Sequence, residues 1–320
     1  MKSTAENHQV RYLEIGAEQH GQRIDNFLIT KLKGVPKSRI YRIIRKGEVR
    51  VNKKRVKQTS RLQQGDLVRI PPIRTAGKCA PLARSSVKWI EDAILYEDNL
   101  LLVLDKPSGI AVHGGSGISY GVIEALRALR SEAVNYELVH RLDRATSGVL
   151  LIAKKRSALR FMHDLIRDHG MEKRYLALMA GKMRKSKVVL APLSKSMLRS
   201  GERMVRVDPE GKSAESRFIP RLSCESSTLV EVEIVTGRTH QIRVHGAHIG
   251  HPLAGDERYG LQEYNQQMSD MGLGRLFLHA RELVFPHPAD GTTMRIEAPL
   301  PQRLAEVVAR IEKSESCRHF

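Results

Sequence analysis

The sequence predicts an α+β fold, with a small N-terminal module followed by a large domain built on a mixed, mainly antiparallel sheet. In the large part, predicted strands and helices alternate irregularly across long loops, without an evenly repeated strand–helix–strand unit. A hydrophobic content of 41% in 320 residues is enough for a large core. Charge separates the small module, because residues 20–74 hold 16 Lys and Arg but 3 Asp and Glu, which gives +13 of the net +19.

The small module is expected to span residues 20–72. Four apolar residues at helical spacing predict its first helix: Ile24, Phe27, Leu28 and Leu32. Ser38 is the predicted N-cap of a second helix, and Gly47 is the residue predicted to end it. Alternating apolar residues at 49–52 and 67–70 predict two strands, so the expected order is helix, helix, strand, turn, strand.

The rest of the chain is divided by composition. We expect residues 1–19 to be a polar lead-in, residues 73–92 a linker with little apolar periodicity, residues 93–313 the large domain, and residues 314–320 a loose tail. Apolar runs predict strands at 99–104, 148–153, 175–180, 228–235 and 282–285. Amphipathic segments predict helices at 121–129, 157–169, 239–249 and 302–313.

The cysteines and the apolar runs bear on the compartment. Cys79, Cys224 and Cys317 are far apart and form no CxxC pair, which indicates neither a disulfide framework nor a zinc ribbon and suits free thiols in a reducing cytosol. Residues 1–15 lack the apolar segment of a secretory signal, and no apolar run is long enough to span a bilayer. We therefore expect a cytoplasmic protein without a membrane partner.

The basic residues of the small module are expected to share one face. They are Arg39, Arg42, Arg45 and Lys46 on the second helix, and Arg50, Lys53, Lys54 and Arg55 on the next strand and turn. Such a concentration of positive charge is typical of a surface that binds a polyanion. The stretch 23–70 resembles the αL RNA-binding module of ribosomal and rRNA-modifying proteins, which implies RNA as the partner. The alternative is a basic helix pair that contacts protein.

In the large domain, the segment HRLDRATSG at 140–148 is the most informative. It sets Asp143 among His140, Arg141 and Arg144, and an apolar run that predicts a buried strand follows. An aspartate at the end of a strand, in a positive surround, is expected to stay ionised and to face an anionic ligand. The alternative is a turn or N-cap aspartate whose neighbours are basic by chance.

Several segments of the large domain, taken in order, resemble the RluA-type pseudouridine synthases. They are DKPSG at 105–109, HRLDRATSG at 140–148, KRYLA at 173–177, TGRTHQIRVH at 236–245 and GDERYG at 255–260. The resemblance spans nearly the whole chain and implies an enzyme that isomerises uridine in RNA, with Asp143 as the catalytic residue. Ala145 stands where many members have a second aspartate, a position that varies within the family.

The resemblance implies roles for further residues. Tyr175 would stack on the extruded uracil, although a core tyrosine is the commoner interpretation of such a position. Arg243 would pair with Asp143 and keep it ionised; its alternative is a phosphate contact. Arg141 is the candidate to fill the space that the extruded uridine leaves, with a phosphate clamp as its alternative.

The implied reaction requires no cofactor. A glycosidic C–N bond breaks, the uracil turns and a C–C bond forms, so nothing is oxidised and a carboxylate suffices as nucleophile or base. Other kinds of site are disfavoured. The four histidines between 240 and 251 lack the spacing of a zinc site, and the chain has no GxSxG or GxxxxGK[ST] motif.

We therefore predict a pseudouridine synthase that acts on 23S ribosomal RNA. Its expected partner is ribosomal RNA, free or in an assembly intermediate of the large subunit, and its expected state is a monomer. Two alternatives stay open: a non-catalytic RNA-binding or ribosome-assembly protein on a synthase scaffold, and a synthase that acts on tRNA. The joint presence of Asp143, Tyr175 and Arg243 favours an enzyme, because a decayed scaffold would tolerate the loss of any of them.

Overall fold

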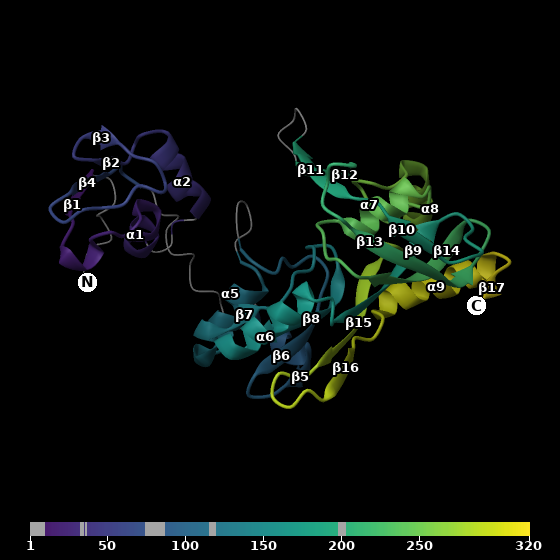
Figure 1. The fold of residues 1–320 in the computed structure, drawn as a ribbon. Helices are drawn as coiled ribbons and strands as arrows, with labels where there is room; N and C mark the ends of the chain where they lie inside the picture. Colours follow the sequence, from purple (N-terminus) through teal and green to yellow (C-terminus); the bar gives the residue numbers. More distant parts are fainter. Residues whose placement is uncertain (1–9, 33–34, 36, 74–86, 115–119, 198–202) are drawn as a thin grey trace. The chain divides into compact units, whose positions relative to one another are not determined.

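The structure is a computed structural model that describes residues 10–32, 35, 37–73, 87–114, 120–197 and 203–320 (Figure 1). The chain divides into two compact units, Met1–Pro81 and Leu82–Phe320. Most of the expected linker at 73–92 lies outside the described residues. Each unit has its own sheet and its own core.

The first unit combines two helices with a four-stranded sheet. Its elements are β1 (Arg11–Glu14), η1 (Ala17–Gln19), α1 (Ile24–Lys31), α2 (Lys37–Arg45), β2 (Arg50–Val51), β3 (Lys54–Arg55) and β4 (Leu67–Ile70). The strand order is β1-β4-β2-β3, and the pairs are antiparallel. The predicted order of helices and strands is present. However, α2 begins at Lys37, so Ser38 lies inside the helix and not at its N-cap.

Apolar side chains of the two helices form the core of this unit. Ile24, Phe27 and Leu28 of α1 are at most 2% exposed, as are Ile40 and Ile43 of α2. Their spacing is the one that the helical period predicts for a buried face. Arg42 and Arg45 of α2 are exposed on the opposite face.

The second unit is larger and mixes helices with strands throughout. Its elements are α4 (Trp89–Asp92), β5 (Ile94–Glu97), β6 (Leu101–Lys106), α5 (Val122–Leu129), η2 (Ser131–Asn135), β7 (Glu137–Leu138), β8 (Ser147–Ala153), α6 (Arg156–Arg167), β9 (Glu172–Ala180), β10 (Lys187–Leu190), β11 (Leu193–Met197), β12 (Arg203–Val207), β13 (Glu215–Ser223), β14 (Ser227–Ile234), α7 (Gln241–His248), α8 (Gln262–Asp270), β15 (Leu278–Pro286), β16 (Thr293–Glu297), α9 (Gln302–Ser314) and β17 (Arg318–His319). An 11-stranded sheet follows the path β10-β13-β14-β9-β15-β8-β6-β5, with β16 beside β15, β17 beside β13 and β7 beside β8. Strands β11 and β12 form a separate hairpin (Figure 1).

One parallel pair joins two antiparallel parts of the large sheet. Strand β15 runs parallel to β8, whereas the other described pairs of this sheet are antiparallel. The predicted α+β fold on a mixed, mainly antiparallel sheet is confirmed. At the parallel pair, Ala280 lies opposite Gly148. Gly148 has a φ of 109°, and a Cβ there would lie 2.1 Å from the carbonyl oxygen of Ala280, so the close approach requires glycine.

The two faces of the large sheet have separate cores. Leu150 and Ile152 of β8 belong to a cluster that includes residues of α5. Val149 and Leu151 point to the other face, into a cluster that includes residues of α6. Strand β8 is therefore buried along its whole length, and it gives the loop that precedes it a rigid support.

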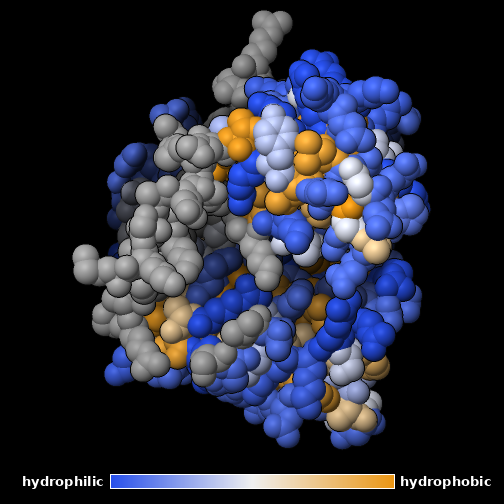
Figure 2. All heavy atoms as spheres, turned by 90° about the vertical axis from the view of Figure 1, so that its left-hand side faces the viewer, coloured by the Kyte–Doolittle hydropathy of each residue, from blue (hydrophilic) through white to orange (hydrophobic). Residues whose placement is uncertain are grey.

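Hydrophilic side chains cover most of the described surface that Figure 2 shows, with apolar residues in smaller patches. Val188 and Leu190, 57% and 72% exposed, lie on β10 at one edge of the large sheet. Where the chain is described, none of its helices has the length and apolar character needed to cross a bilayer.

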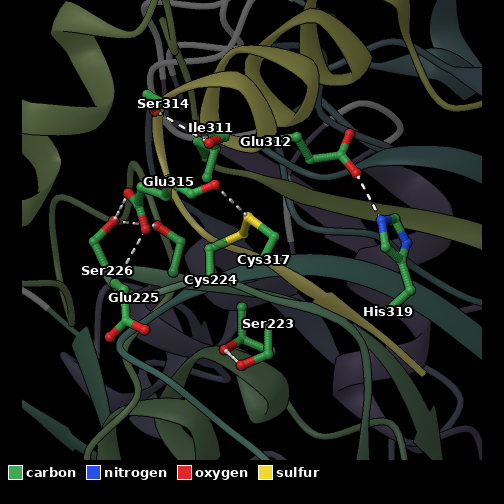
Figure 3. The surroundings of a disulfide bond; sticks show 12 residues. Ser223, Cys224, Glu225, Ser226, Ile311, Glu312, Ser314, Glu315, Cys317 and His319 are labelled. Atoms are coloured by element: carbon green, nitrogen blue, oxygen red, sulfur yellow. Dashed lines mark hydrogen bonds and ion pairs between the residues drawn. A yellow bond between two sulfur atoms is a disulfide. The ribbon is translucent and has the colours of Figure 1, made fainter.

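The structure contains a disulfide between Cys224 and Cys317, which contradicts the expectation of free thiols (Figure 3). Cys224 follows β13 and Cys317 precedes β17, and these strands pair with Ser223 opposite Arg318. Cysteines 93 residues apart in sequence are therefore neighbours across the sheet. The predicted loose tail at 314–320 is wrong for the same reason, since β17 extends the sheet. Cys79 lies outside the described residues.

Reduction of this disulfide is expected to lower the unfolding free energy by about 2–4 kcal/mol, because the bond restricts a long loop of the unfolded chain. Thermal denaturation of the oxidised and the dithiothreitol-treated protein measures the change. Cys317→Ser should unfold at the same temperature with and without reductant, whereas Cys79→Ser, the matched control, should respond as the wild type does. A wild-type unfolding temperature that does not change with reductant would contradict the presence of this disulfide.

Candidate active site

Asp143 lies in the loop just before β8, and hydrogen bonds hold this loop to a second loop that follows β6. The backbone N–H of Gly109 donates to the carbonyl of Arg144 at 2.8 Å. The hydroxyl of Ser108 donates to the carbonyl of Ala145 at 2.7 Å. These two bonds fix the backbone directly after Asp143.

Lys106 is fully buried at the end of β6 and joins the same two loops. Its ammonium donates to the carbonyls of Pro107 at 2.8 Å and Ile110 at 2.9 Å, and to that of Arg144 at 3.4 Å. Burial lowers the pKa of Lys106 to about 7, against the opposing charge of Asp143. The lysine thus supports the loop of Asp143 and adds to the electrostatic field around it.

The Asp143 carboxylate is 21% exposed and faces two hollows. The smaller, of about 70 Å³, has Tyr175 and Ile234 in its wall, and the larger, of about 1260 Å³, is bordered by Met204. Five residues line both hollows: Arg141, Leu142, Asp143, His240 and Arg243. The carboxylate of Asp143 is therefore open to a ligand that enters from solvent.

Tyr175 lies on β9 and is 8% exposed. It pairs with Ala280 of β15, which in turn lies opposite Gly148, so the ring comes next to the start of β8. Burial raises the pKa of the Tyr175 hydroxyl well above its usual range, and the charge of Asp143 adds to the shift, so the hydroxyl stays protonated. The ring is both part of the core and part of the wall of the smaller hollow.

Arg243 of α7 does not form the pair with Asp143 that the family resemblance implied. Its guanidinium donates to Asp256 instead, with Nε 2.7 Å from Oδ2 and Nη2 2.6 Å from Oδ1. The Asp256 side chain is fully buried and also accepts the backbone N–H groups of Arg258 and Tyr259, each at 3.0 Å. Burial opposes the charge of Arg243, but Asp256 and then Asp143 raise its pKa, so the guanidinium stays charged.

His240 lies beside Asp143, with its Nε2 3.7 Å from a carboxylate oxygen. It is the N-cap residue of α7 and has a φ of 54°, in the left-handed region that few residues other than glycine adopt. Its Nδ1 lies 2.9 Å from the hydroxyl of Tyr259. Burial lowers the pKa of His240; Asp143 opposes this shift and Arg243 adds to it, so the ring is neutral at neutral pH.

The sequence did not distinguish His240 from the three other histidines that lie between residues 240 and 251. Its position three residues before Arg243 in TGRTHQIRVH was the available signal. Two other histidines of the cluster have partners of their own: His245 contacts Ser216 and the Ala191 carbonyl, and His251 contacts the Ala180 carbonyl. Within the described ranges, no three His, Cys, Asp or Glu side chains are placed to hold a metal ion.

The three basic neighbours of Asp143 differ in what they do. His140 accepts the backbone N–H of Leu151 at 3.1 Å, and burial lowers its pKa to about 4, so it is uncharged. Arg144 donates to the carbonyl of Gly109 at 2.8 Å and belongs to the loop contact. Arg141 is exposed and lines both hollows, where its charge faces an incoming ligand.

In the first unit, the predicted RNA-binding residues lie at the surface. Seven are exposed and Arg39 is half-buried; the exposed ones are Arg42, Arg45, Lys46, Arg50, Lys53, Lys54 and Arg55. Asn52 and Lys53 have φ values of 48° and 68°, as the tight turn between β2 and β3 requires. Arg45 and Arg55 line one hollow of about 370 Å³, so the helix and the hairpin contribute to one basic surface.

Both units match known families. Residues 100–248 match the RNA pseudouridylate synthase family, and residues 22–68 match the S4 domain. A solved structure, the human RNA pseudouridylate synthase domain containing 4, is similar with a TM-score of 0.59 and 26% identity, covering 72% of this chain and 96% of that chain.

Curated relatives are similar over almost the whole length. A protein of Yersinia pestis is 55% identical over 98% of this chain and 99% of its own. A protein of Escherichia coli K12 is 56% identical over 97% of this chain and 99% of its own. One of Salmonella typhi is 58% identical over 93% of this chain and 96% of its own. Each relative is named ribosomal large subunit pseudouridine synthase C.

Proposed function

The chain belongs to the RNA pseudouridine synthase family, and from that premise we propose that it isomerises uridines of large-subunit ribosomal RNA to pseudouridine, with Asp143 as the catalytic residue. The substrate follows the names of relatives that are 55–58% identical over most of the chain. The assignment of Asp143 rests on the placement of its carboxylate.

The single observation that supports this role most strongly is an accessible carboxylate on a rigid support. Asp143 faces two hollows, and its loop is held by Lys106 and by the contacts of Gly109 with Arg144. Tyr175 and the charged Arg243 also line the smaller of these hollows. Such preorganisation is what a group that must approach one sugar atom requires.

The chemistry balances with the residues of this chain alone. The C1′–N1 bond of the uridine breaks, a C1′–C5 bond forms, the proton on C5 leaves, and N1 gains a proton. Asp143 serves either as the nucleophile at the sugar or as the base that removes a sugar proton. The neutral Tyr175 ring would stack on the base while it turns, and Arg141 would occupy the space that the base leaves in the RNA.

RNA binding is assigned to the S4 domain and its basic surface. We propose that the chain acts as a monomer in the cytoplasm, on free ribosomal RNA or on an assembly intermediate of the large subunit. Mapping pseudouridines by carbodiimide-dependent reverse-transcription stops, in cells with and without the gene, tests this function. If the stops that disappear without the gene lie only in tRNA, the proposal of ribosomal RNA as the substrate is wrong. If no stop disappears, the proposed isomerase activity is wrong.

Replacing Arg45 and Arg55 by Gln is expected to weaken RNA binding. It should also reduce the slope of log affinity against log salt by about one unit for each phosphate that the variant no longer neutralises. Filter binding over a range of salt concentrations measures the slope. Lys187→Gln is the control, since this exposed residue lies on β10 of the other unit. An unchanged slope in the double variant would show that the basic surface does not contact RNA.

A further inference from the structure

Tyr259 connects three parts of the second unit next to Asp143. Its hydroxyl accepts the backbone N–H of Val205 in β12 at 3.0 Å and lies 2.9 Å from Nδ1 of His240. The guanidinium of Arg243 lies 5.0 Å from the centre of its ring. The side chain of Tyr259 thus contacts the β11–β12 hairpin, His240 and Arg243. The last two residues line the same hollows as Asp143.

These contacts select one tautomer of His240. Because the Tyr259 oxygen already accepts the N–H of Val205, its own proton is free to be donated to Nδ1 of His240. The neutral imidazole then carries its proton on Nε2, the nitrogen that faces Asp143 at 3.7 Å. The other tautomer would turn a nitrogen lone pair toward the carboxylate, which is unfavourable.

The hairpin borders the same space as Asp143. Met204 of β12 lines the larger hollow, and the side chain of Val205 is buried in a small cluster with Leu193, Ala214 and Val244 of α7. Tyr259 and this cluster therefore attach the hairpin to the helix that carries His240 at its N-cap.

We propose that Tyr259 is a positioning residue for the isomerisation: it holds His240 with Nε2–H toward Asp143 and so ties the β11–β12 hairpin to the orientation of the catalytic carboxylate. The proposal rests on the proposed function of Asp143. It assigns no bond-making step to Tyr259 or His240, only the direction in which the carboxylate points.

The test is Tyr259→Phe in the full chain, assayed by steady-state kinetics on a large-subunit RNA transcript. The substitution removes both hydrogen bonds of the hydroxyl, and loss of the one to His240 predicts a kcat about three- to tenfold lower with KM unchanged. Tyr264→Phe is the matched control, because that buried tyrosine bonds the hydroxyl of Ser227 on β14. In a His240→Gln background, whose amide can donate to Asp143 without help, Tyr259→Phe should have no further effect.

The outcomes separate the two proposals. Nitrogen-15 shifts of the histidine rings, assigned with His240→Gln, should give an Nε2–H tautomer for His240 in the wild type and a mixture in Tyr259→Phe. Two results would overturn the inference alone while the wild type is active. One is a Tyr259→Phe variant that is no slower than Tyr264→Phe, and the other is an Nδ1–H tautomer of His240 in the wild type. A wild type without isomerase activity would overturn the proposed function and the inference together.

Discussion

Asp143→Asn is expected to abolish uridine isomerisation, with a rate loss on the order of 10³–10⁴-fold, and to leave RNA affinity nearly unchanged. The amide is almost the same size as the carboxylate but can neither attack the sugar nor remove a sugar proton. The loop of Asp143 is held by Lys106, Gly109 and Ser108, so the substitution leaves its backbone supports in place.

Tritium release from RNA labelled at uracil C5 measures the isomerisation, and filter binding measures the affinity. Asp164→Asn is the matched control, because it removes the same charge from an exposed pair with Arg167 on α6. That control should keep wild-type activity. A purified Asp143→Asn variant with full activity would refute the catalytic assignment and would favour another carboxylate.

Asp256→Ala is expected to lower the unfolding free energy by about 3–5 kcal/mol. The substitution leaves the guanidinium of Arg243, whose side chain is 11% exposed, without two charge-assisted hydrogen bonds. It also removes the acceptor of the backbone N–H groups of Arg258 and Tyr259. Because Arg243 lines both hollows, activity should fall together with stability.

Urea denaturation compares this variant with Asp164→Ala, whose pair with Arg167 is exposed and should contribute less than about 1 kcal/mol. Equal losses in the two variants would contradict the structural role of Asp256.

The pH dependence of the unfolding free energy gives a second test of this role. Burial opposes the shift, but the bonds and charge of Arg243 lower the pKa of Asp256 below 3.8. The contribution is therefore present above pH 3.8 and is lost as the pH falls through the lower pKa of the folded state.

Long apolar runs were enough to predict the central strands. Strands β8 and β9 are buried along most of their length, and their sequences read as strands for that reason. Strand β13 was missed because its residues alternate between buried and exposed, several are charged, and Pro220 lies next to a register shift. The hairpin of β11 and β12 was missed too, since short strands with basic residues resemble loops in composition.

The sequence motifs predicted which residues line the site, but they did not predict which residues contact one another. The motifs name Asp143 and Tyr175, which lie on the walls of one hollow, and their roles stay predictions. The contact of Arg243 with Asp256 was not predicted, because it depends on how the segment with Asp256 packs on α7 and not on sequence spacing. The disulfide was missed for the same reason, since only the pairing of β13 with β17 brings its cysteines together.

The parallel contact between β8 and β15 has a consequence for how the chain gains activity. Asp143 comes from the strand group on one side of this two-residue seam, whereas Tyr175, His240 and Arg243 come from the group on the other side. The active site is therefore complete only after β8 has paired with β15. During refolding, enzymatic activity should return when the two strand groups come together. It should return later than the circular-dichroism signal of the secondary structure within each group.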